Sequence, residues 1–332
     1  MLSNREFVKS DQPIRTNGSN RIYTYNQYLQ ARFGQRVQSV TIDAGFTCPN
    51  RDGTVASGGC TYCSNDSFSP ASHTYRPKVY IKPTTPVSKQ IDDQIGFLGR
   101  RYGTDKFIAY FQAFSNTYAP VDQLEALYAE ALANPSIIGL TVGTRPDCVE
   151  EEKLDLFERL ARTHYVSLEY GCESIYDTTL KWANRGHDFA CFVDAVERTS
   201  ARGLTVGAHY MLGFPTETRT EMLAAAEKLS SLPISFLKLH NLHIVDKTVL
   251  ARQYAAEPFS IFRLEEYVNL VADFLERLRP DICIQRLHAE TPAPLRIAPA
   301  WSTTGQEMQQ LVQKELEKRN THQGCRFCLP SA

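Results

Sequence analysis

The sequence predicts an α/β fold in which a parallel sheet closes into a full or partial (β/α) barrel. Two observations predict it: β-rich runs recur along the chain, and apolar residues at helical spacing lie between them. Strands that alternate with helices in this way form parallel sheets with right-handed crossovers. Because seven such runs are present, a barrel is favoured over an open sheet, and its site is expected at the carboxyl ends of the strands.

The expected strands cover residues 37–43, 106–114, 136–143, 165–171, 204–212, 235–244 and 281–288. The expected helices cover residues 121–133, 151–161, 189–203 and 219–232, and a charged amphipathic helix follows at 306–320. Gly203 directly after Arg202 fits the glycine that commonly ends a helix. We expect three parts: a loosely held polar tail at 1–20, a barrel core at 21–290 and a C-terminal extension at 291–332.

Composition limits the function classes. The 332 residues carry a formal net charge of −1, so any contact with a polyanion needs a local basic patch. The N-terminal segment has no apolar signal-peptide core, and no run approaches the 18 apolar residues of a membrane span. We therefore expect a cytoplasmic protein with no membrane contact. The nine cysteines are then thiols or metal ligands rather than disulfides.

Near the ends of the later strands, polar residues have a partner two positions on, which shares their face of the strand. The pairs are Glu169 and Gly171, His209 and Met211, Lys238 and His240, and Arg286 and His288. A strand covered on both faces should not carry such residues unless the barrel lumen uses them. A buried polar network that satisfies itself explains any one of these residues equally well.

Three cysteines lie in the loop after the first expected strand, with the sequence CPNRDGTVASGGCTYC. Cys48, Cys60 and Cys63 are too few for a structural zinc site, whereas a four-iron cluster held by three thiolates keeps one iron open for a further ligand. Gly58 and Gly59 free the backbone to wrap a bulky group. The alternatives are a zinc site completed by a distant ligand, or three unrelated thiols.

The segment GFTCPNRDGTVASGGCTYCSNDSF resembles radical S-adenosylmethionine (SAM) enzymes, and closely the YhcC-like radical SAM family. That family is related in its core to the catalytic subunit of Elongator. Similar segments follow in the family's order over about residues 20 to 300: YFQAFSNTYAP, VGTRPDCV, LEYGCESIYDTTLKWANRGHD, YMLGFPTET and KLHNLHIVDKT. The resemblance implies a partial (β/α) barrel of the radical SAM type.

The resemblance also implies a 4Fe–4S cluster on Cys48, Cys60 and Cys63, and reductive cleavage of SAM to a 5′-deoxyadenosyl radical. It assigns no catalytic side chain. Six positions match residues that surround SAM in the family: Tyr62, Ser115, Asn116, Glu173, Arg185 and Gly213.

The matched positions imply separate roles around SAM. Tyr62 would lie against the adenine, Ser115 and Asn116 near the amino group, and Arg185 against the carboxylate. Gly213 would let the adenine approach the backbone. Glu173 stands where the family usually shows glutamine, so it can accept hydrogen bonds from the ribose but cannot donate while ionised.

The implied substrate is a wobble uridine in tRNA, with an electron donor such as flavodoxin or ferredoxin. Four residues are expected to line the substrate end of the barrel: Lys238, His240, Arg286 and His288. Arg76, Lys78 and Lys82 alternate with tyrosines at 72–83, a composition that suits an unpaired base or an ordinary extended connection. The rival functions are radical modification of a small metabolite or peptide, and a non-catalytic iron–sulfur protein.

The remaining cysteines fall into two groups. Four are expected to be small buried apolar residues: Cys148, Cys172, Cys191 and Cys283. At the C-terminus, His322, Cys325 and Cys328 have the spacing of metal ligands. They predict either a zinc or auxiliary cluster site completed by another ligand, or a frayed tail with two incidental thiols.

Overall fold

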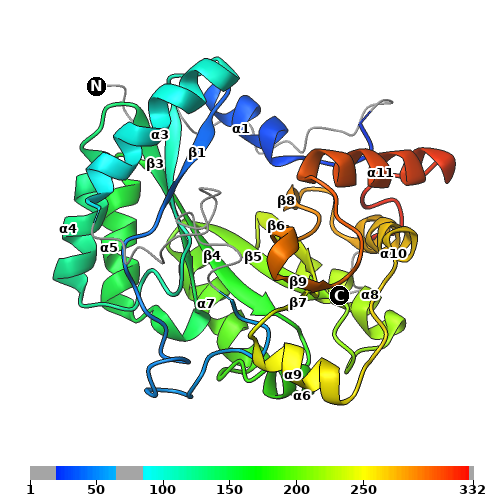
Figure 1. The fold of residues 1–332 in the computed structure, drawn as a ribbon. Coiled ribbons are helices and arrows are strands. Elements are labelled where there is room, and N and C mark those ends of the chain that lie inside the picture. The colour runs from blue at the N-terminus through cyan, green and yellow to red at the C-terminus, as the bar shows by residue number, and fades with distance from the viewer. Residues whose placement is uncertain (1–19, 65–84, 329–332) are drawn as a thin grey trace.

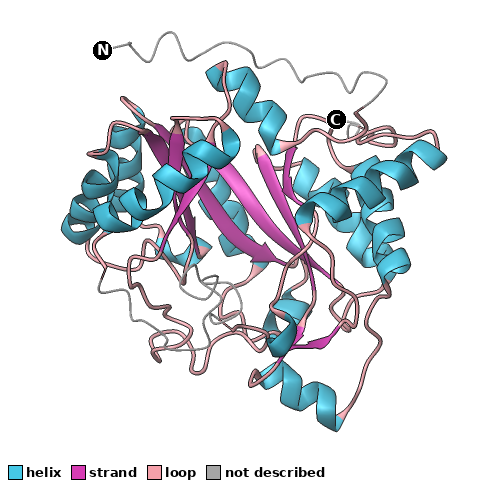
Figure 2. Cartoon of the chain, turned by 45° about the horizontal axis from the view of Figure 1, so that its top comes forward, coloured by secondary structure: helices cyan, strands magenta, loops and turns pink. Residues whose placement is uncertain are grey.

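The computed structural model describes residues 20–64 and 85–328. Seven parallel strands form one sheet in the order β1-β2-β3-β4-β5-β6-β8. The sheet curls into a half-barrel with most of the long helices along its outer face (Figures 1 and 2). Its strands are β1 (Gln38–Ile42), β2 (Phe107–Phe111), β3 (Ile137–Thr144), β4 (Tyr165–Glu173), β5 (Thr205–Leu212), β6 (Phe236–Asn241) and β8 (Cys283–Arg286). The expected partial (β/α) barrel and all seven of its strands are confirmed.

The helices of the described residues connect and cover these strands. They are α1 (Tyr25–Phe33), α3 (Val87–Tyr102), α4 (Val121–Leu132), α5 (Glu151–Ala161), α6 (Asp177–Trp182), α7 (Phe189–Ala201), α8 (Arg219–Ser230), α9 (Val249–Ala256), α10 (Leu264–Arg277) and α11 (Gly305–Lys318). The expected helices correspond to α4, α5, α7, α8 and α11. Among the described helices, none is long and apolar enough to cross a membrane.

Side-chain caps define where helices start near the carboxyl ends of the strands. The Asp188 carboxylate accepts the Cys191 N–H at the start of α7. Thr218 and Glu221 form a capping box at the start of α8. Such caps satisfy backbone donors that the helix itself leaves free, so both helices begin at fixed residues.

One expected strand ends early. The strand predicted over 235–244 stops at Asn241, which pairs with Leu212, the last residue of its neighbour β5, so β5 offers no further strand residues beyond it. The chain then forms β7 (Ile244–Val245), which pairs antiparallel with β9 (Arg296–Ala298). The prediction of one long strand was wrong for this reason.

Aromatic side chains close the amino end of the half-barrel. The ring of Phe236, the first residue of β6, meets Tyr25 and Tyr28 of α1 edge-on, with centroids 5.2 and 4.7 Å apart. The Ile284 N–H donates to the Tyr23 carbonyl at 2.8 Å, so the segment before α1 continues the sheet beyond β8. This aromatic layer keeps water out from below the strands.

The C-terminal segment is held against the barrel. The Gln323 side chain accepts the Tyr23 N–H at 3.0 Å and donates to the Ile282 carbonyl at 2.7 Å. Arg326 pairs with the buried Glu276 carboxylate of α10 at 2.9 Å. The reading of this segment as a frayed tail was therefore wrong up to the last described residue.

Some predictions concern residues that the structure does not describe. Residues 1–19 of the expected N-terminal tail are outside the described ranges, and so are Arg76, Lys78 and Lys82. Among the described side chains, no three His, Cys, Asp or Glu residues are placed to hold a single metal ion. The side chains of His322, Cys325 and Cys328 are among those described. A metal completed by a further ligand there stays a prediction.

Candidate functional site

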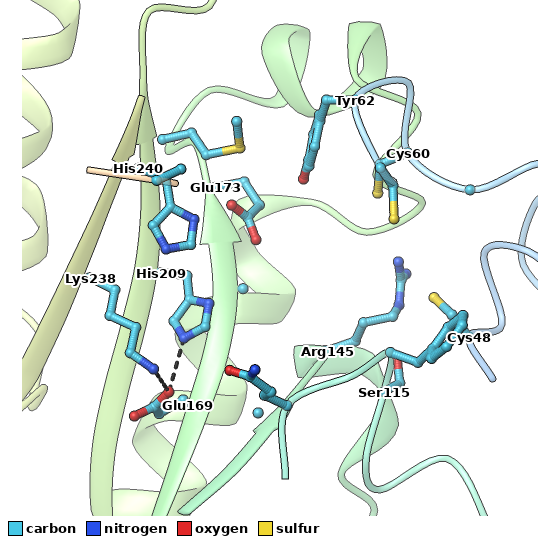
Figure 3. Close-up of a pocket in the computed structure, with 18 of the residues that line it drawn as sticks. Cys48, Cys60, Tyr62, Ser115, Arg145, Glu169, Glu173, His209, Lys238 and His240 are labelled. Atoms are coloured by element: carbon cyan, nitrogen blue, oxygen red, sulfur yellow. Dashed lines mark hydrogen bonds and ion pairs between the residues drawn. The ribbon is translucent and has the colours of Figure 1, made fainter. Parts of the chain in front are cut away.

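A cavity of about 470 Å³ lies at the carboxyl ends of the strands. Its lining contains ten of the residues singled out from the sequence: Cys48, Cys60, Tyr62, Cys63, Ser115, Glu173, Arg185, Lys238, His240 and Arg286. The thiols and the Lys238 side chain lie at opposite ends of it (Figure 3). One cavity thus joins the predicted cluster loop to the predicted substrate residues.

The cysteine loop is fixed by the connection between α6 and α7. The Thr61 N–H donates to the Ala183 carbonyl at 2.9 Å, and the Asn184 amide donates to the Gly59 carbonyl at 2.9 Å. The Asn50 side chain donates to the Asn184 carbonyl at 2.5 Å. Because these bonds hold both ends of the loop, Cys60 keeps its place against Arg185.

Cationic and amide donors surround the thiols. Cys60 Sγ accepts from Arg185 Nη1 and from Asn50 Nδ2, each at 3.5 Å, and Arg51 Nη1 lies 3.8 Å from Cys63 Sγ. Burial, followed by the neighbouring Cys60, raises the pKa of Cys63 to about 12. A thiol in such a place stays protonated until a metal displaces the proton, and the nearby donors then stabilise the thiolate.

Three buried polar atoms near the cysteine end of the lining have no hydrogen-bond partner among the described residues. They are the Tyr62 hydroxyl, the Ser115 hydroxyl and Arg185 Nε. Buried polar atoms are normally bonded, so a group of orphans around one cavity indicates a polar ligand. These atoms lie on the lining together with the thiols, as a bound SAM beside a cluster requires.

Cys48, Cys60 and Cys63 all lie on the lining of this one cavity. Three thiolates can hold a four-iron cluster and keep one iron open for a further ligand. The thiols therefore fit the 4Fe–4S group that the spacing suggested.

Arg185 is placed by a close approach to β4. Its Nη2 donates to the Gly171 carbonyl at 2.8 Å and lies 3.8 Å from the Glu173 carboxylate. A Cβ at residue 171 would come within 2.3 Å of Nη2, so the position requires glycine. Glu173 has a left-handed backbone with φ 66°, which turns its carboxylate into the cavity beyond the strand register shift.

The far end of the cavity is built around Glu169, whose side chain is fully buried. It accepts from Lys238 Nζ at 2.5 Å, His209 Nε2 at 3.0 Å and Gln285 Nε2 at 2.7 Å (Figure 3). Lys238 also donates to the Tyr110 hydroxyl at 2.8 Å. We call these five side chains the Glu169 cluster.

Glu169 is ionised at neutral pH. Burial alone would raise the pKa of Glu169, but Lys238 and His209 outweigh it and hold this pKa far below its ordinary value. Beside the cluster, the His240 ring lies 5.4 Å from the His209 ring. Burial lowers the pKa of His240 well below its ordinary value, so this imidazole is neutral.

Three residues expected at the site do not line the cavity. Asn116 is buried beside it and donates to the Gly143 carbonyl at 2.8 Å. Gly213 has φ 104° and faces Phe262, with 3.4 Å between that ring and an added Cβ. His288 is buried with Nε2 2.9 Å from the Thr303 carbonyl. The strand β8 has ended at Arg286, so alternation no longer determines where His288 lies.

Two further residues were not singled out from the sequence. Arg145 forms a two-point ion pair with Asp147, at 2.8 and 2.6 Å, and donates to the Arg185 carbonyl at 2.7 Å. The segment VGTRPDCV, which resembles the family, contains both residues and could have pointed to Arg145. Gln285 reaches Glu169 because a register shift between β6 and β8 changes the alternation along β8. No simple sequence pattern shows such a shift.

Comparison with known proteins identifies the family of the chain. Residues 50–229 match the radical SAM superfamily, and residues 234–318 match the radical SAM C-terminal domain. The chain is 34% identical to "Uncharacterized protein YtqA" of Bacillus subtilis over 98% of its own length and 96% of that protein. It is 35% identical to "Protein YhcC" of Escherichia coli over 82% of its length and 85% of that protein.

More distant matches concern part of the chain or the fold alone. A "tRNA uridine(34) acetyltransferase" of Methanocaldococcus infernus is 24% identical over 61% of this chain and 38% of that protein. The solved structure of the archaeal Methanocaldococcus infernus Elp3 has a TM-score of 0.63 at 17% identity, covering 86% of this chain and 64% of that one. The family-model match over residues 50–229 and the two relatives at 34% and 35% identity establish that the chain belongs to the radical SAM superfamily, as a relative of YtqA and YhcC.

Proposed function

We propose that Cys48, Cys60 and Cys63 hold a 4Fe–4S cluster, that SAM binds beside it in the cavity, and that the substrate is a wobble uridine in tRNA. When bound, the cluster supplies the electron that cleaves SAM to a 5′-deoxyadenosyl radical. The observation that carries the proposal is the single cavity on which three thiols and three orphaned polar atoms lie together.

The orphaned groups would bind and orient SAM. Arg185 Nε can donate to the carboxylate, and the Ser115 hydroxyl can bond the amino group. The Tyr62 hydroxyl is buried between the cysteines, where an adenine can pack against its ring. Glu173 can accept from ribose hydroxyls, and Arg185 Nη2 lies 3.8 Å from its carboxylate.

The Glu169 cluster would form the substrate end. Its three donors come from β5, β6 and β8, so the carboxylate is held by rigid strands rather than by loops. The aromatic layer beneath these strands excludes water from that side. A radical formed in this cavity is thereby shielded from bulk solvent.

Two findings support tRNA as the substrate. The distant relative named as a tRNA uridine(34) acetyltransferase acts on a wobble nucleoside by its name. Arg286 and Lys238 also provide positive charge on the lining. The formal net charge of −1 instead favours a small metabolite or peptide, which is the second candidate.

Nucleoside mass spectrometry of tRNA from a deletion strain tests the substrate. We expect one modified wobble uridine to disappear and its precursor to accumulate. The strain must be shown to make that precursor normally. An unchanged set of wobble nucleosides would leave the small-molecule candidate in place of tRNA.

A binding experiment tests the SAM site separately. The reduced, reconstituted protein should slowly form 5′-deoxyadenosine, and Arg185→Ala should weaken SAM binding by about tenfold or more, because it removes a charge-assisted hydrogen bond. Arg252→Ala removes the same charge from the exposed face of α9 and is the control. Equal SAM affinity in the two variants would contradict the role of Arg185.

A further inference from the structure

The charges on the cavity lining do not balance at the substrate end. Each carboxylate there already has a partner. Glu169 is bound by its cluster, Glu173 lies 3.8 Å from Arg185, and Glu290 accepts the Gly305 N–H at 2.8 Å. Arg286, by contrast, lies exposed at the open side of the same cavity and has no carboxylate within ion-pair distance among the described residues, so its guanidinium is free to meet a ligand.

Two further polar groups near Arg286 lack partners. Asn241 is 4% exposed, and its oxygen accepts the Ala289 N–H at 3.1 Å, which leaves the amide NH₂ buried with no acceptor. His240 Nε2 is likewise buried without a partner among the described residues. Both residues lie on the cavity lining at the carboxyl end of β6.

The strands place Lys238, His240 and Arg286 side by side, and Asn241 follows at the end of β6. Lys238 stands opposite Arg286 in the β6–β8 register, and His240 follows two residues later on the same face of β6. Lys238 uses two of its three N–H donors on Glu169 and Tyr110 (Figure 3 shows its bond to Glu169). The unsatisfied capacity here consists of a guanidinium, an ammonium N–H, an amide NH₂ and an imidazole nitrogen, and it includes no unpaired carboxylate.

We propose that Arg286, Lys238, His240 and Asn241 form an anion subsite that holds a negatively charged oxygen group of the substrate. A guanidinium binds carboxylate or phosphate through two parallel hydrogen bonds, and the amide and ammonium donate to the remaining lone pairs. This inference rests on the proposed function for the uridine and deepens it: the nucleoside would carry its charge either on the base side chain, as a carboxylate, or on the sugar, as a phosphate.

Equilibrium binding to the anaerobically reconstituted full chain tests this subsite without turnover. The probes are uridine with a carboxymethyl group at C5, its neutral carbamoylmethyl counterpart, and uridine 5′-monophosphate beside plain uridine. We expect one charged probe to bind about tenfold or more tighter than its neutral counterpart, as a charge-assisted pair does. A preference for the carboxymethyl probe would identify a carboxylate as the bound group, and a preference for the 5′-monophosphate would identify a phosphate.

Variants assign the preference to Arg286. Arg286→Gln should remove the preference for the charged probe, and Arg286→Lys should restore part of it, while Arg252→Gln on the exposed face of α9 should leave it intact. Asn241→Leu should reduce it less than Arg286→Gln does. Equal binding of charged and neutral probes by the wild type, or a preference that survives Arg286→Gln, would overturn the subsite.

The outcome is separable from the proposed function. Iron content and 5′-deoxyadenosine formation do not depend on Arg286, so they report on the cluster and SAM alone. If both are present and no probe shows a charge preference, the subsite fails and the radical SAM proposal stands. If iron and 5′-deoxyadenosine formation are absent while the charge preference is present, the radical SAM proposal fails and the anion subsite stands.

Discussion

The two ends of the cavity are built in opposite ways. At the cysteine end, the thiols lie on a loop, and Tyr62, Ser115 and Arg185 each have a buried polar atom without a partner in the described residues. At the other end, Glu169 is fully buried and accepts from three strand side chains. The polar groups of the first end need a ligand, whereas the Glu169 carboxylate at the second end is satisfied by the protein alone. The difference predicts where substitutions affect binding and where they affect folding.

The largest expected effect is at the cysteine end, and it is a loss of bound iron and sulfide rather than a loss of stability. Replacing Cys48, Cys60 and Cys63 together with alanine should reduce bound iron and sulfide from about four per chain to near zero, because the cluster loses all its protein ligands. Metal and sulfide analysis after anaerobic reconstitution measures this. Cys191→Ala on α7 is the matched control, and full iron in the triple variant would rule out these ligands.

The next effect is at the Glu169 end and concerns stability. Glu169→Gln leaves the Lys238 ammonium buried without its counter-ion, which should lower the unfolding free energy by about 3–5 kcal/mol. Glu125→Gln breaks a surface pair with Arg159 and should cost less than about 1 kcal/mol. Urea denaturation compares the two.

A second substitution separates charge from shape in this pair. Adding Lys238→Met to Glu169→Gln removes the uncompensated charge and should restore part of the lost stability. A double variant as unstable as the sum of the single variants would contradict the ion-pair explanation.

The pH dependence of stability should come from buried ionisable side chains of the protein itself, such as His243 and Glu169. Burial, together with Arg296 and His288, lowers the pKa of His243 to about 3 from 6.5. Between these values the unfolded chain binds a proton that the folded chain does not. Stability is therefore complete above pH 6.5 and falls on acidification, by at most about 1.4 kcal/mol per pH unit for this group. The pKa of Glu169 is also lowered, so this carboxylate adds to the loss of stability at pH values below its ordinary pKa of 4.5.

Denaturation curves between pH 7.5 and 5 measure this slope. His243→Gln should make it shallower, because the group that gains a proton on unfolding is gone. The same slope in wild type and variant would show that His243 does not contribute.

The smallest effect compares two tyrosines on one lining. Tyr110→Phe removes an acceptor of Lys238 and should cost about 1 kcal/mol in the cluster-free protein, whereas Tyr62→Phe should change stability by less than about 0.5 kcal/mol, because its hydroxyl has no described partner. SAM binding should show the reverse order. If Tyr62→Phe is the more destabilising of the two, the comparison between the ends is wrong.

The strands were predictable because parallel strands buried on both faces are continuous apolar runs, as in SIIGLTVG and YVSLEYG. The helix α3 was missed because Gly96 and Gly99 interrupt its pattern. The helix α10 was missed although LEEYVNLVADFLER has clear helical spacing, so the signal was present.

The site was predictable where spacing or alternation determines it. The cysteine spacing found the thiols, and alternation along β4, β5 and β6 found Glu169, His209 and Lys238. Their bonds were not predictable, because Glu169 and Lys238 lie on strands separated by β5 in the sheet. His288 and Gly213 lie beyond strand ends, where the turn decides the direction of the chain.

The bonds of Gln323 also bear on the order in which the chain is completed during synthesis. The cysteine loop emerges from the ribosome early, and its bonds to Ala183 and Asn184 can form once that connection has followed. The edge of β8 is fixed by Tyr23 and Gln323, which are 300 residues apart, so that contact forms only after nearly the whole chain has been made. The half-barrel thus gains the loop for the metal first and the strand that carries Arg286 last.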